Sequence, residues 1–107
     1  MNLPKVLADL VTAQNEFNSV AYANCFSETA EVFDEGKTHS GRKAIEVWID
    51  DSNKKYQSVM EPLSITHDGS TSILSAKCSG KFEGSPLVLQ FHFDIEDGLI
   101  QRLRVTG

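Results

Sequence analysis

The residues of this chain that could carry acid–base chemistry lie in one short stretch, around Asp34 and His39. Side chains alternate between two faces along a strand, so in AEVFDE an inward Val32 predicts an inward Asp34. A carboxyl group at the wall of an apolar cavity is costly to ionise and can accept a proton or anchor a polar group. His39 lies across the expected turn and could exchange a proton near neutral pH. Asp34 and His39 are therefore the candidate catalytic residues.

Both residues also have a non-catalytic interpretation. Aspartate is common in turns, and Asp34 could cap the turn at Gly36 through the backbone. His39 could be a half-exposed loop histidine. The sequence alone leaves both interpretations open.

Other chemical signatures are missing from the sequence. The three histidines and two cysteines have no zinc-site spacing, and we expect no metal. There is no dinucleotide, phosphate-loop, serine-hydrolase or zincin motif, and we expect no cofactor. Cys25 and Cys78 are expected to be buried thiols.

The first half of the chain has helical periodicity. Apolar residues recur at three- and four-residue steps from Leu3 to Phe17, which predicts an amphipathic helix with Asn2 as N-cap. Asn18 or Ser19 should cap a second, short helix that includes Phe26.

A strand, a turn and a third helix are expected next. The strand covers residues 31–34, and Gly36 allows a turn that returns through residues 38–39. Ser40 and Gly41 then open a helix whose apolar stripe includes Trp48.

The second half alternates with period two. The alternation predicts four strands, at Leu63–Ile65, Leu74–Phe82, Leu87–Ile95 and Leu99–Val105. The turns between them are short, so neighbouring strands should be antiparallel, with a bulge in the last one. Helices followed by a strand meander define an α+β fold, and 107 residues suit a single domain, 1–107.

The charge balance limits the partners. With 10 basic and 15 acidic side chains the formal charge is −5, which disfavours nucleic acid and anionic membrane surfaces. The N-terminus MNLPKVLADLV has no uncharged apolar run of the kind found in signal peptides or membrane spans. We expect a cytoplasmic location, no membrane and no nucleic acid.

The order of these elements resembles the cone-shaped α+β fold of the nuclear transport factor 2-like superfamily, in particular its SnoaL-like members. Three segments carry the resemblance: FSETAEVFDEG, HSGRKAIEVWI and FDIEDGLIQRLRV. The resemblance implies N-terminal helices packed on a curved, mainly antiparallel sheet that encloses a pocket. It also implies a homodimer formed through the outer face of the sheet, which carries Lys77, Ser79, Gln90 and His92.

One relative, ketosteroid isomerase, is similar only in part. The position of its catalytic base corresponds to Asp34. The position of its tyrosine donor corresponds to Leu10, and that of its second acid corresponds to Leu89 or Gln90. Since each oxyanion donor contributes roughly 3 to 4 kcal/mol, a steroid isomerase of that type is disfavoured. SnoaL-like polyketide cyclases also use an acidic pocket residue, which keeps Asp34 a candidate acid or base.

Three functions remain open. The first is a module that binds a small, largely apolar molecule, with Asp34 and His39 as polar anchors. The second is an isomerase, cyclase or dehydratase in which Asp34 moves a proton, and the third is a dimeric structural or assembly module. The residues expected to contact the ligand are Phe26, Val32, Trp48, Phe91 and Phe93.

Overall fold

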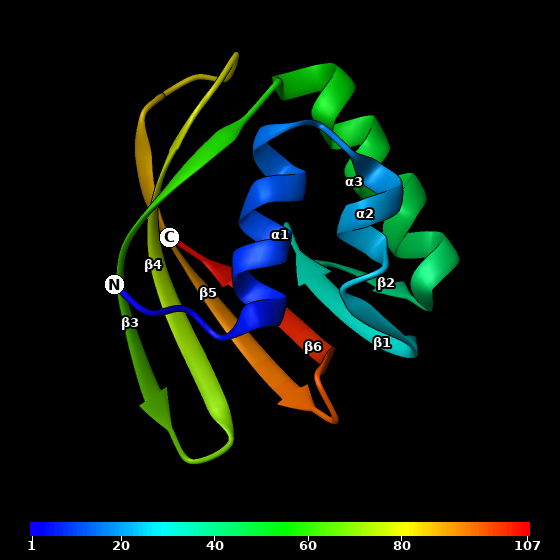
Figure 1. Ribbon diagram of the computed structural model, residues 1–107. Helices are drawn as coiled ribbons and strands as arrows, with labels where there is room; N and C mark the ends of the chain where they lie inside the picture. The colour runs from blue at the N-terminus through cyan, green and yellow to red at the C-terminus, as the bar shows by residue number, and fades with distance from the viewer.

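The computed structural model describes residues 1–107, with the helices on one side of a curved sheet (Figure 1). The three helices are α1 (Lys5–Asn15), α2 (Ser19–Ala23) and α3 (Arg42–Tyr56). The strands are β1 (Phe26–Asp34), β2 (Lys37–Ser40), β3 (Val59–Asp68), β4 (Thr71–Ser79), β5 (Leu87–Glu96) and β6 (Leu99–Thr106). The α+β fold expected from the sequence is confirmed.

All six strands form one sheet in the order β2-β1-β6-β5-β4-β3. The last four strands pair antiparallel, as their short turns predict. The parallel pair of β1 with β6 joins the first strand to the last, and Val32 lies opposite Leu103 in it. This pairing makes the N-terminal hairpin an extension of the C-terminal sheet.

Interruptions of the strand registers accompany the curvature of the sheet. The register of β3 on β4 shifts between Pro62 and Ser64, and that of β5 on β6 shifts between Asp94 and Ile95. Such bulges bend a strand and increase its local twist. The second shift confirms the irregularity expected at the last hairpin.

The entry into α3 is fixed by the residues of the Gly-Arg segment. Gly41 has φ +91°, a conformation that favours glycine, and its N–H donates to the Ala30 carbonyl at 2.7 Å. The Arg42 guanidinium donates to the Phe26 carbonyl from Nε at 3.0 Å and from Nη2 at 2.8 Å. These three bonds tie the start of α3 to the backbone of β1.

The core lies between the helices and the concave face of the sheet. Its largest fully buried side chains come from α1, α3 and all strands except β2 and β3: Leu7, Leu10, Phe26, Val32, Ile45, Leu74, Phe93, Ile100 and Leu103. Cys25 and Cys78 are buried free thiols, as expected.

Three local predictions were wrong. Pro4, and not Asn2, is the N-cap of α1, without a side-chain cap bond. Phe26 opens β1 instead of ending a helix, because α2 stops at Ala23 and Asn24 is its C-cap. Phe82 lies beyond the end of β4 at Ser79, in the loop before β5. Asn18 does cap α2, where its side chain accepts from the Ala21 N–H at 3.0 Å.

Gly80 lies against the segment that joins α3 to β3, and this contact predicts the cost of any side chain there. A Cβ at Gly80 would lie 2.6 Å from the Tyr56 carbonyl oxygen and 2.9 Å from the Ser58 Cα, both backbone atoms. We expect Gly80→Ala to lower the free energy of unfolding by about 1–3 kcal/mol in urea denaturation. Gly107→Ala, where a Cβ meets nothing within 4 Å, is the control. Equal urea denaturation midpoints for the two variants would show that the segment between α3 and β3 moves aside without loss of stability.

Candidate functional site

A cavity of about 490 Å³ opens between the helices and the sheet, beside the core. Most of its 19 lining residues are hydrophobic, and they come from all three helices, the β1–β2 turn and the C-terminal strands. Trp48, Ile49 and Tyr56 of α3 form one part of the wall, and Leu89 and Phe91 of β5 form another. Polar groups interrupt this surface: Gln14, Tyr22, Asp34, Glu35, Ser52, Tyr56, Ser58, Glu83 and Thr106.

Asp34 lies on the cavity wall, two residues along β1 from the fully buried Val32. Burial is the main cause that raises its pKa above the ordinary value, and the charge of Glu35 adds to the rise. The charge of His39, the backbone N–H of Glu35 and the Trp48 side chain oppose it. The net direction is upward, so the carboxyl group holds a proton more readily than a solvated aspartate does.

His39 contacts Trp48 but lies outside the cavity. It lies opposite Val32 in the β1–β2 pair, and its ring stacks on Trp48 with centroids 5.4 Å apart and planes at 29°. It is not among the residues that line the cavity. The imidazole therefore orients Trp48 and acts on Asp34 through its charge.

The five expected ligand contacts divide into two groups. Trp48 and Phe91 line the cavity, whereas Phe26, Val32 and Phe93 have no exposed surface and belong to the core. Val32 and Phe93 both lie opposite Leu103, in the middle of the sheet. Alternation identifies the inner face of a strand, but it does not tell which part of that face the helices cover.

Sequence reasoning named three of the residues that line the cavity, Asp34, Trp48 and Phe91, and Tyr22 and Glu35 are among those it missed. Tyr22 is 3% exposed, and burial, with smaller contributions from Cys25 and Asp34, strongly raises its pKa, so the phenol stays protonated. Its ring lies 6.2 Å from that of Trp48. Glu35 and Gly36 both have positive φ, as a type I′ turn requires, so the alternation that predicts an outward Glu35 ends at Asp34.

The donor positions of the ketosteroid isomerase pattern supply no donor to the cavity. Gln90, one of the two positions for the second acid, donates to Ser75 at 2.8 Å and does not line the cavity. Leu10 is fully buried in the core, and Leu89 lines the cavity with an apolar side chain. The phenols that line this cavity are Tyr22, from α2, and Tyr56, from α3.

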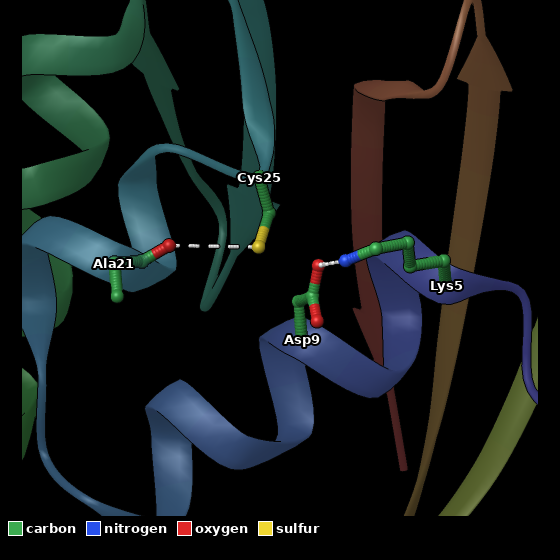
Figure 2. A network of polar contacts seen from close by, with 4 residues as sticks. All are labelled: Lys5, Asp9, Ala21 and Cys25. Atoms are coloured by element: carbon green, nitrogen blue, oxygen red, sulfur yellow. Dashed lines mark hydrogen bonds and ion pairs between the residues drawn. The ribbon is translucent and has the colours of Figure 1, made fainter.

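A second hollow, lined by α1, the end of α2 and the β5–β6 turn, contains Cys25. Figure 2 shows Cys25 with Ala21, Lys5 and Asp9. The Cys25 thiol donates to the Ala21 carbonyl with a sulfur–oxygen distance of 3.5 Å, and Lys5 pairs with Asp9 at 2.9 Å. Burial raises the pKa of Cys25 to about 11, which keeps the thiol protonated and weakly nucleophilic. Cys25 and Asp34 thus line different hollows.

No three His, Cys, Asp or Glu side chains lie close enough together to hold a metal ion. None of the helices combines the length and the apolar character needed to cross a membrane.

Comparison with known proteins places this architecture among the cystatin-like, cone-shaped α+β folds. Neither a family model nor a curated protein sequence matches the chain. Among solved structures, protein SMa1630 of Sinorhizobium meliloti, a candidate polyketide cyclase, is 38% identical with a TM-score of 0.92, over 97% of this chain and 95% of that one. The chain belongs to the SnoaL-like proteins of the nuclear transport factor 2-like superfamily.

More distant structures share the fold alone. A protein of Catenulispora acidiphila with a ketosteroid isomerase-like fold, in complex with trimethylamine, is 16% identical with a TM-score of 0.87, over 99% of this chain and 87% of that one. SalBIII, an epoxide hydrolase/cyclase-like enzyme of pyran ring formation in salinomycin, is 20% identical with a TM-score of 0.80, over 94% of this chain and 86% of that one.

The surroundings of Asp34 predict how it titrates. A pH titration followed by the carboxyl ¹³C NMR signal should give a pKa above the ordinary value of about 3.8. Trp48→Phe removes the indole N–H that favours the carboxylate, so this variant should titrate higher still.

The same shift predicts a pH dependence of stability. Because the folded-state pKa is raised, the stability that Asp34 gives is present at low pH and falls as the pH rises through the folded-state value. Asp34→Asn should therefore unfold like the native chain at pH 3 and be the more stable of the two at pH 7. A pKa at or below the ordinary value, or equal stability at pH 7, would contradict both expectations.

Proposed function

We propose that the protein binds a small, largely apolar molecule in the cavity between α3 and the sheet. The observation that carries the proposal is the mainly hydrophobic lining of a 490 Å³ space. Cavities of this size and composition are typical of small-molecule sites. The three carboxyl groups on the wall, Asp34, Glu35 and Glu83, favour neutral ligands over anions.

A second candidate function is proton transfer on the bound molecule by Asp34. Its raised pKa and its place on the wall suit a general base, and the protonated Tyr22 could donate to an oxygen that becomes negative. The description of the Sinorhizobium protein as a candidate polyketide cyclase also supports this chemistry, since cyclisation of a polyketide involves carbon acids.

We also propose a homodimer, on the basis of the resemblance to the superfamily. The outer face of the sheet carries His92, which bonds to Thr106 across β5 and β6 at 3.0 Å, and Gln90, which bonds to Ser75 at 2.8 Å. These cross-strand bonds fix polar side chains on the face that a second copy would contact.

Blocking the cavity tests the binding function. We expect Leu89→Trp to weaken calorimetric binding of camphor, a compact apolar probe, at least 10-fold, because the indole fills the space where Leu89 lines the wall. Val88→Trp is the matched control, since Val88 is 49% exposed and points to the other face of β5. Equal weakening in both variants, or no binding to the native chain, would contradict the proposal.

Proton transfer is tested by hydrogen exchange. In D₂O the native chain should accelerate exchange of the α-protons of 1-tetralone, followed by ¹H NMR, and Asp34→Asn should lose most of the acceleration, roughly 100-fold or more. Asp94→Asn, on the outer face of β5, is the control for a general loss of charge. Undiminished exchange in Asp34→Asn would remove Asp34 as the base.

Light scattering at micromolar concentration tests the dimer. The expected mass is twice 11.8 kDa. A mass of one chain would contradict it, and His92→Glu, which places a second carboxylate beside Asp94 on the outer face, should shift a dimer toward the monomer.

A further inference from the structure

Gln14 is a polar side chain of the cavity wall to which neither proposed function assigns a role. It lies in the last turn of α1, is only 8% exposed and lines the cavity beside apolar residues such as Ile49 and Met60. A buried amide is costly unless its hydrogen-bonding groups are satisfied. The partners of its nitrogen and oxygen therefore show what the amide can still bind.

Both hydrogens of the Gln14 amide are already used. Nε2 donates to the Ser58 carbonyl at 2.6 Å and to Oδ1 of Asn53 at 3.2 Å. A backbone carbonyl can only accept, so the reverse orientation of the amide would bring two oxygens together at Ser58. The chemistry of Ser58 thus fixes which way Gln14 points.

Oε1 of Gln14 has no donor within the protein. No hydrogen bond to it is formed, yet it is not one of the fully enclosed atoms without a partner, which are Ser27 Oγ and Asn53 Nδ2. Oε1 is therefore accessible, and the cavity is the space that Gln14 lines. The wall presents a neutral acceptor at this point.

The acceptor is held in place by its neighbours. Asn15 donates from Nδ2 to the Met60 carbonyl at 3.0 Å and accepts from the Met60 N–H at 2.7 Å, which fastens the end of α1 to β3. Ser58 is confined on its other side by Gly80. A preorganised acceptor loses little entropy when a ligand donor reaches it.

We propose that Gln14 determines specificity in this cavity by accepting a hydrogen bond from a hydroxyl group of the ligand. The ligand class is then a small, largely apolar alcohol. The inference rests on the proposed binding function. A hydroxyl matches this acceptor because both groups are neutral, and a site with an unused buried acceptor discriminates against molecules that lack the donor.

Borneol and camphor test this role, since they share one skeleton and only borneol has a hydroxyl. Trp48 is the single tryptophan and lines the cavity, so its fluorescence follows both titrations. Gln14→Met should weaken borneol about 10-fold, the value of one hydrogen bond of about 1.4 kcal/mol, and change camphor less than 2-fold. Gln101→Met, the same substitution away from the cavity, should change neither.

Each other result overturns the inference. Equal weakening of both probes would show a structural role for Gln14, and no weakening of either would show that the hydroxyl binds elsewhere; in both cases the proposed binding function stands. Failure of the native chain to bind either probe would overturn the binding function and this inference with it.

If Gln14→Met does not fold, the native chain gives the answer by NMR. The side-chain carbonyl ¹³Cδ signal of Gln14 should move downfield with borneol and stay in place with camphor. No movement with saturating borneol overturns the inference.

Discussion

The attachment of α1 to the start of β3 decides where the core ends and the cavity begins. Asn15 exchanges two hydrogen bonds with the backbone of Met60, and Gln14 donates to the Ser58 carbonyl. Such bonds each contribute about 0.5–1.5 kcal/mol, but their main effect is positional. They hold α1 over the middle of the sheet, where Leu7 and Leu10 pack on the core, and leave the other part of the same inner face to the cavity.

The electrostatics of the cavity depend on this division. Asp34 lies at the wall, where burial disfavours its charge, while His39 and Trp48 favour it. Trp48 thus lines the cavity, stacks on His39 and opposes the rise in the pKa of Asp34. A balance of this kind keeps a carboxyl group available both as a polar anchor and as a proton acceptor, which is why the two candidate functions share one residue.

Membership of the SnoaL-like proteins does not by itself assign chemistry, because one fold carries many functions. The donors of ketosteroid isomerase correspond to Leu10 in the core and to either Leu89 in the wall or Gln90 outside the cavity. Polar groups enter this cavity from other elements: Tyr22 from α2, Gln14 from α1 and Asp34 from β1. The distribution of these groups, and not the fold, limits what the cavity can hold.

The sequence determined the element order, the antiparallel meander and the inward Asp34, because periodicity and short turns act locally along the chain. It did not reveal that β1 pairs in parallel with β6, which places Val32 beside Leu103, nor that Phe93 is core while Phe91 lines the cavity. The division between core and cavity depends on which helix covers each strand position. Only tertiary packing decides this. Two residues that are two positions apart on one strand face have the same place in the alternation but are covered by different parts of the structure.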